Sequence, residues 1–114
     1  MTRRSFQIFA GIILFLSAVL GAAATPLTVP DMLSAGRVDD AVRALNTRVQ
    51  STPSDAEAYH LLSRAYFHLK KWDQAISNGE KAIQLNPNKS EYHLWLGRAY
   101  GEKADASSFI TAAG

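Results

Sequence analysis

Cysteine is absent from this sequence of 114 residues. Its absence excludes disulfide bridges, thiolate nucleophiles and cysteine metal sites together. Glycine-rich nucleotide loops, a nucleophile elbow, and the signatures of kinases and zinc proteases are also absent. We therefore predict a protein that is not an enzyme, with no cofactor and no small-molecule substrate.

Most of the chain also lacks an excess of charge of either sign. Arg3 and Arg4 supply two of the twelve Lys and Arg residues, so ten basic residues stand against ten acidic ones from Thr25 onward. A neutral surface of mixed charge gives no electrostatic footprint for nucleic acid or for an anionic membrane. We expect no nucleic-acid partner.

The N-terminal apolar run is too short for a well-matched membrane span. It covers residues 6–20, which is 15 residues, whereas a spanning helix needs about 20. Two arginines precede it and small residues 21–24 follow it, as is typical of a secretory signal peptide. We predict a signal peptide over residues 1–24, cut after Ala24 or Ala23, and an exported protein that is periplasmic or secreted. The alternative is that residues 6–20 are retained as an anchor, and only then would the chain contact a membrane.

A period of 34 residues runs through the rest of the chain. A fixed period of this length marks a helical solenoid. Among the residues that coincide after this shift are Asp39 with Asp73, Ala41 with Ala75, Gln50 with Gln84, Pro53 with Pro87, Glu57 with Glu91, Leu62 with Leu96, Arg64 with Arg98, Ala65 with Ala99 and Tyr66 with Tyr100.

The spacing of apolar residues predicts helices. Ser54 with Glu57, and Asn88 with Glu91, have the spacing of capping boxes. Small Ala75 and Gly97 should let helix axes approach closely. We expect helices near 30–35, 38–51, 55–69, 72–85 and 90–103, and a last one beginning around 106.

The repeated unit resembles the tetratricopeptide repeat (TPR), whose pattern places an aromatic residue, Leu-Gly, Tyr, Ala and Pro at fixed positions. Ser63 replaces the usual Gly and Gly79 the usual bulky residue, so we expect looser contact between the paired helices there. Arg48 stands where the family has Ala, which indicates a degenerate, exposed first repeat. The residues of the central unit that carry the resemblance are Tyr59, Leu62, Ser63, Tyr66, Ala75, Gly79, Ala82 and Pro87.

The resemblance implies an all-α TPR-type solenoid of antiparallel helix pairs, with about two and a half repeats preceded by a signal-peptide helix. Residues 25–54 would be a degenerate partial repeat, 55–89 a complete repeat and 90–114 an incomplete repeat. Phe109 falls where the family has a small residue, so a longer loop and a helix realigned on Ala112 or Ala113 are expected. The last apolar face would then lack a capping helix. This predicts either the front part of a longer protein or a second chain that covers the end.

In TPR proteins the first helix of each pair lines the concave surface, so the resemblance also implies a peptide-binding groove. Arg64 and Arg98, one repeat apart, could each hold a carboxylate by paired hydrogen bonds. The competing interpretation is that both are solvated side chains or partners within their own helices. The Lys and Asn arrangement by which some TPR domains hold a terminal carboxylate is not present. The implied groove residues are Glu57, His60, Arg64, Phe67, His68, Glu91, Leu94 and Arg98.

The histidines do not predict a metal site. His60 and His68 are eight residues apart on one helix face, a separation of about 12 Å, which is too far for one ion. His93 is interpreted as a packed ring.

The leading hypothesis is a non-catalytic interaction scaffold in the cell envelope that binds a protein or peptide partner. One alternative is the non-catalytic TPR region of a larger exported enzyme. The other is a membrane-tethered assembly factor.

Overall fold

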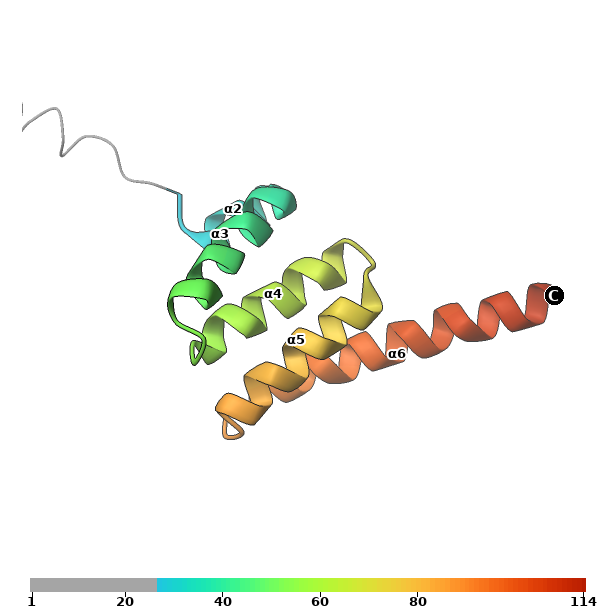
Figure 1. The fold of residues 1–114 in the computed structure, drawn as a ribbon. Coiled ribbons are helices and arrows are strands. Elements are labelled where there is room, and N and C mark those ends of the chain that lie inside the picture. The colour runs from blue at the N-terminus through green and yellow to red at the C-terminus, as the bar shows by residue number, and fades with distance from the viewer. Residues whose placement is uncertain (1–26) are drawn as a thin grey trace, which may run out of the picture.

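The computed structural model describes residues 27–114, and every regular element in this range is an α-helix (Figure 1). The all-α prediction is confirmed. The predicted signal peptide over residues 1–24, with its alternative as an anchor, lies outside the described residues. The helices are α2 (Val29–Ser34), α3 (Val38–Ser51), α4 (Ala56–His68), α5 (Trp72–Leu85) and α6 (Ser90–Ala113). None of these five helices combines the length and the apolar character that a membrane crossing requires.

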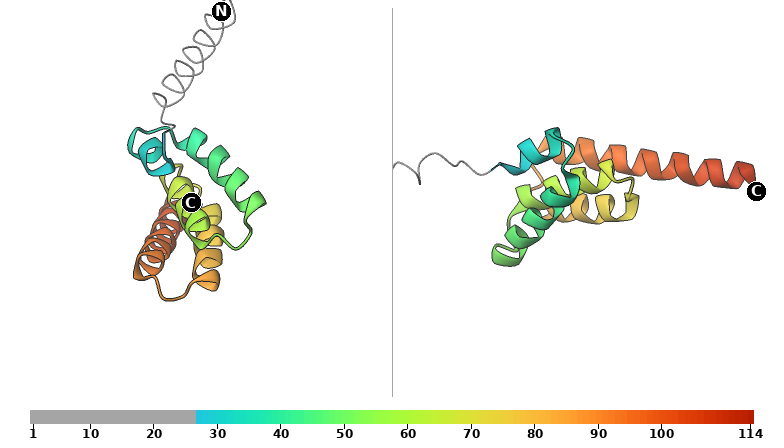
Figure 2. Two further views of the ribbon diagram at one scale, coloured as in Figure 1. Left: turned by 90° about the vertical axis from the view of Figure 1, so that its left-hand side faces the viewer. Right: turned by 90° about the horizontal axis from the view of Figure 1, so that it is seen from above.

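The helices stack in sequence order, each packed against the next, with α4 in the middle (Figures 1 and 2). Helices α4 and α5 form an antiparallel pair, and α6 lies beside α5 while also touching α4. This is the architecture of an α-solenoid built from adjacent helix pairs. Its consequence for function is that α4 and α6 share one surface.

Two clusters of buried side chains hold the stack together. The first lies between α3 and α4 and contains Leu45, Leu61 and Leu62. The second lies between α5 and α6 and is built around Ile76. Tyr66 packs against both clusters, so one side chain of α4 joins the two layers. The helices approach closely because alanines fill their contact faces. Six alanines are fully buried: Ala41, Ala58, Ala65, Ala75, Ala82 and Ala99.

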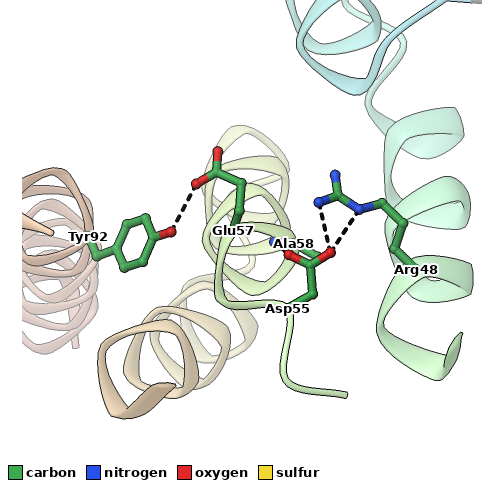
Figure 3. Close-up of polar contacts among 5 residues, drawn as sticks. All are labelled: Arg48, Asp55, Glu57, Ala58 and Tyr92. Atoms are coloured by element: carbon green, nitrogen blue, oxygen red, sulfur yellow. Dashed lines mark hydrogen bonds and ion pairs between the residues drawn. The ribbon is translucent and has the colours of Figure 1, made fainter. Parts of the chain in front are cut away.

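The start of α4 is fixed by Asp55 rather than by the predicted Ser54 capping box (Figure 3). The Asp55 carboxylate accepts the backbone N–H of Ala58 at 3.0 Å, which satisfies one of the free donors at the helix start. The same carboxylate accepts two hydrogen bonds from the Arg48 guanidinium, at 2.8 and 3.2 Å. The Ser54 prediction was wrong because Asp55 stands one residue nearer the helix.

The capping box predicted at Asn88 was also wrong, since α6 begins after Lys89 without a side-chain cap. A capping box forms instead at the start of α2. The Thr28 hydroxyl accepts the Asp31 N–H at 3.3 Å, and the Asp31 carboxylate accepts the Thr28 N–H at 3.2 Å.

Helix α6 runs unbroken for 24 residues, where the sequence predicted a helix ending near 103 and another beginning near 106. That prediction, with its longer loop and realigned helix, was wrong. Residues 101–113 contain no proline and four alanines, so nothing local stops the helix. The Lys103 ammonium also pairs with Asp73 of α5 at 2.6 Å, directly before the expected loop. Beyond that point α6 projects past the other helices (Figure 2).

The contact between α4 and α5 is close at the position where the sequence predicted a loose fit. The Ser63 hydroxyl is buried and donates to the Ala75 carbonyl at 2.6 Å. A Cβ added to Gly79 would lie 3.1 Å from the Ser63 Oγ and 3.3 Å from Leu96 Cδ1. The larger side chain has moved from α5 to α4, and the two substitutions compensate.

The close approach expected at Gly97 is not found within the described residues. A Cβ added there would meet no atom within 4 Å. The reason is that α6 has no following helix across it in residues 27–114, whereas α4 has α5 across the equivalent position at Ser63.

Candidate partner-binding surface

The residues predicted to line the groove lie on α4 and α6, the two helices that start at the same end of the stack (Figure 1). Glu57, His60, Arg64, Phe67 and His68 come from α4, and Glu91, Leu94 and Arg98 from α6. Tyr92 and Trp95 of α6 join them. We call these ten residues the α4–α6 surface.

His60 does not line a groove but is buried between the two helices, with 1% of its side chain exposed. Its ring stacks on Tyr92, with ring centroids 4.6 Å apart and planes at 25°. Its Nε2 has no hydrogen-bond partner and lies 3.5 Å from the Glu91 carboxylate. Burial lowers the pKa of His60, although Glu57 and Glu91 act in the opposite direction. His60 is therefore a neutral packing residue beside an exposed carboxylate.

Tyr92 connects α6 to the start of α4 (Figure 3). Its hydroxyl donates to the Glu57 carboxylate at 2.9 Å. Burial and this acceptor raise the pKa of Tyr92 to about 12, because both disfavour a phenolate. The phenol therefore stays a hydrogen-bond donor at neutral pH and holds Glu57 at the edge of the surface.

Trp95 lies at the centre of the surface. The guanidinium carbons of Arg64 and Arg98 each lie 4.9 Å from the centre of its ring. The Phe67 ring meets Trp95 edge-on, with centroids 5.3 Å apart, and the His68 ring is 6.2 Å away. Cations over an indole face are attracted by the ring quadrupole. Both arginines are thus held in place by one aromatic side chain.

Few carboxylates lie close to the two arginines. Arg64 lies 3.8 Å from Glu91, and its Nε is buried without a hydrogen-bond partner. Within residues 27–114, no carboxylate lies within ion-pair distance of Arg98. Arg64 has no acidic partner within α4 and is 30% exposed in its side chain. Arg98 is exposed and lies over Trp95 of its own helix, so the competing interpretation fits Arg98.

The remaining predicted residues lie at the border of the surface or outside it. Leu94 is 55% exposed. His93, predicted to be a packed ring, is exposed instead, and its Nε2–H donates to the Pro87 carbonyl at 2.9 Å. This hydrogen bond stabilises the turn before α6, and the His93 ring does not fill the core.

The chemistry offered here is recognition by charge and aromatic contact. No group of three or more His, Asp or Glu side chains in residues 27–114 is arranged to hold a metal ion. Two open hollows, of about 460 and 330 Å³, lie elsewhere, over α5 and between α5 and the C-terminal half of α6. On the α4–α6 surface, the stacked rings occupy the space between the helices. None of the ten residues of this surface lines either hollow.

Comparison with known protein families finds a match to the repeated unit. The family described as tetratricopeptide repeat matches residues 56–89, which contain the whole of α4 and α5. Over residues 56–89, the chain is similar to a tetratricopeptide repeat. The matched TPR includes the compensating pair Ser63 and Gly79, so their departure from the usual pattern leaves the helix pair intact.

Two curated proteins resemble longer parts of the chain. Superkiller complex protein 3 of Mus musculus is 35% identical over 68 residues, which is 60% of this chain and 4% of the mouse protein. Intraflagellar transport protein 70A of Danio rerio is 31% identical over 75 residues, which is 65% of this chain and 12% of the zebrafish protein. The chain therefore spans only a small part of either relative. TPRs generally mediate contacts between proteins.

Trp95 and Tyr92 were not among the residues predicted to line the surface. The signal was present, because Glu91, Trp95 and Arg98 are spaced four and three residues apart and so share one face of a TPR helix. Tyr92 gave no such signal, since its hydroxyl reaches Glu57 only through the packing of α6 on α4.

Proposed function

We propose that this protein is a non-catalytic scaffold in the cell envelope, which binds a segment of a partner protein on its α4–α6 surface. The single observation that carries the proposal is the pair of arginines held on Trp95. Aromatic residues and arginine contribute most to binding energy at protein interfaces. Two ordered guanidinium groups also lose less conformational entropy on binding than free ones.

The partner would place a carboxylate between Arg64 and Arg98 and an apolar group near Phe67 and Leu94. Charge-assisted hydrogen bonds from guanidinium to carboxylate are short and directional. Arg98, which has no acid partner in the described residues, is free to form such bonds. Glu91 holds Arg64 only at 3.8 Å, so a closer carboxylate would displace it.

Selection of peptides from a random displayed library tests the binding proposal. Peptides enriched on the wild-type chain should bind the Arg64→Ala/Arg98→Ala variant at least roughly tenfold more weakly, because two charge-assisted contacts are lost. The matched control is Arg37→Ala/Arg43→Ala, which removes two exposed arginines that both bond to Asp40 near the start of α3. Circular dichroism should show equal helix content in both variants. Peptides that bind both variants equally would contradict the proposal.

The envelope location is proposed from residues 1–24. Fractionation of the native cells and mass spectrometry of the N-terminus test it. An exported form beginning at Thr25 or Ala24 is expected. Membrane-bound chain with Met1 intact would instead support the tethered assembly factor, and chain retained in the cytoplasm would contradict export.

A further inference from the structure

The α4–α6 surface carries two matched pairs of charges, one acidic and one basic. Glu57 and Glu91 are equivalent after the 34-residue shift, and so are Arg64 and Arg98. In each helix the arginine follows the glutamate by seven residues, or about 10.5 Å along the axis. Helices α4 and α6 start at the same end and run the same way (Figure 1), and in each helix the glutamate lies nearer that end than the arginine.

The acidic pair and the basic pair neutralise one another's charge only weakly. Glu57 accepts the Tyr92 hydroxyl, and Glu91 is 59% exposed in its side chain. Across the surface, the nearest approach between the two pairs is the 3.8 Å contact of Glu91 with Arg64. The buried Nε2 of His60, which has no hydrogen-bond partner, lies 3.5 Å from this carboxylate, and the Arg64 contact is made by its Nη1. The acidic and basic side chains of the surface are therefore only partly paired with one another, and they remain available to a partner.

We infer that the partner segment is an amphipathic helix with one acidic and one basic side chain seven residues apart. This inference rests on the proposed function and adds the shape and charge order of the partner. The acidic side chain meets Arg64 and Arg98, and the basic one meets Glu57 and Glu91. Residues i and i+7 share a face of a helix, and their separation along its axis equals that between the glutamate and the arginine within α4 or within α6.

The form of the surface favours a helix over an extended strand. The stacked rings of His60 and Tyr92, and the edge-on rings of Phe67 and Trp95, occupy the space between α4 and α6. An extended peptide needs a slot that takes alternate side chains, whereas a helix lays one apolar face over a broad surface. In an extended strand, residues with the matching separation also point to opposite sides.

Capped helical peptides of defined sequence test the inference. Each peptide is alanine-rich with a central leucine pair, and carries Lys and Glu seven residues apart, two Glu, or two Lys at these positions. A fourth peptide keeps the Lys and Glu but has a central proline, which breaks the helix. Binding of labelled peptides to the full chain is followed by fluorescence anisotropy at low and high salt.

The peptide with Lys and Glu should bind best, and its affinity should fall as salt is raised. The Glu57→Gln/Glu91→Gln variant should bind it roughly three- to tenfold more weakly. The same variant should bind the peptide with two Glu no worse than the wild type does. The control Asp39→Asn, which removes an acidic residue of α3, should change neither affinity.

Each of the other outcomes would contradict a specific part of the inference. Equal binding of the Lys–Glu and Glu–Glu peptides, both still dependent on Arg64 and Arg98, would reject the charge order and leave the proposed function standing. Equal binding of the peptide with proline would reject the helix in favour of an extended segment. Absence of any binding that depends on these arginines would overturn the inference and also count against the proposed function.

Discussion

At the scale of single residues, Asp55 joins two helices with one carboxylate. It caps α4 through the Ala58 N–H and pairs with Arg48 of α3. A cap of this kind contributes about 1 kcal/mol, and a partly exposed ion pair contributes less. Arg48 was interpreted as evidence that the first repeat is degenerate and exposed. In the structure it forms a contact between two repeats.

Replacing Asp55 tests this double role. Asp55→Ala should lower the free energy of unfolding by roughly 1 to 2 kcal/mol, measured by urea denaturation. Arg48→Ala should lower the free energy of unfolding by less than about 1 kcal/mol, because it leaves the cap in place. Equal losses in the two variants would show that the ion pair, not the cap, is the main contribution.

The same carboxylate predicts a loss of stability in acid. Burial raises the pKa of Asp55, but the Ala58 N–H and Arg48 together outweigh it and hold the pKa below its ordinary value. A carboxyl group with a lowered pKa in the folded state stabilises the fold above its unfolded pKa of about 3.9, and this stabilisation is lost as the pH falls through the folded pKa. Asp55→Ala should therefore lose less stability than the wild type below about pH 4.

His60 gives a second pH dependence, at a higher pH. Because burial lowers its pKa, the unfolded chain binds a proton at this residue more readily than the folded chain. Stability should therefore fall as the pH is lowered through about 6.5, the ordinary value for histidine. The groups that face the ring are Glu57, Arg64, Glu91 and Tyr92.

The variant His60→Gln isolates this contribution. Its free energy of unfolding should depend less on pH between about 7 and 5 than that of the wild type, because glutamine does not titrate. Thermal melts at several pH values measure the difference. A variant with an unchanged pH slope would show that another group titrates in this range.

At the scale of helices, the pairing of α4 with α5 depends on which helix carries the larger side chain. The repeat usually has Gly on the first helix and a bulky residue on the second. Here Ser63 fills the space and Gly79 leaves room for it. The arrangement is closely packed because the Ser63 hydroxyl is held to the Ala75 carbonyl and cannot move aside.

A double-mutant cycle tests this compensation. Gly79→Ala should destabilise the chain despite the better helix propensity of alanine, because its Cβ would press on Ser63 and Leu96. Adding Ser63→Gly should recover part of the loss, with a coupling of about 1 kcal/mol. The control is Gly101→Ala in α6, where an added Cβ meets no atom within 4 Å and stability should rise. Strict additivity of the two changes would contradict the compensation.

Helix α6 divides into a packed half and a projecting half. Tyr92 and Ala99 are buried against the neighbouring helices. Phe109 and Ile110, by contrast, are 76% and 72% exposed. In the projecting half, the Ser107 and Thr111 hydroxyls donate to carbonyls four residues earlier in the same helix, at 2.9 Å. Few side chains of this half are buried, so its helical form depends on backbone hydrogen bonds and helix propensity more than on packing.

At the scale of the whole molecule, stability should decrease from the centre of the stack toward its ends. Helix α4 packs against α3, α5 and α6, whereas α2 packs mainly against α3. Segments with few buried contacts open with low free energies. The solenoid is therefore expected to be most rigid where the α4–α6 surface lies.

Amide hydrogen exchange measured by mass spectrometry checks this gradient. Residues 58–66 and 75–83 should exchange slowest, and residues 104–113 should exchange fastest among the helical segments, because their side chains bury little surface. Adding a partner should slow exchange at residues 91–98 and leave 104–113 unchanged. Slow exchange at 104–113 in the purified chain would contradict the gradient and indicate that a second chain covers this end.

The sequence by itself determined the helical solenoid, the antiparallel pairing and the ends of most helices. It could do so because these follow from local periodicity and from a 34-residue repeat, which need no knowledge of distant contacts. It also placed Glu57, Arg64, Glu91 and Arg98 on one surface, because residues equivalent by the repeat lie on equivalent helix faces.

Only the tertiary structure decided what these residues do to one another. The packing of α6 on α4 buried His60, brought the Tyr92 hydroxyl to Glu57 and set both arginines on Trp95. Helical periodicity fixes the direction of a side chain around its own axis, but the distance between two helices, and hence burial and pairing, depends on every side chain between them.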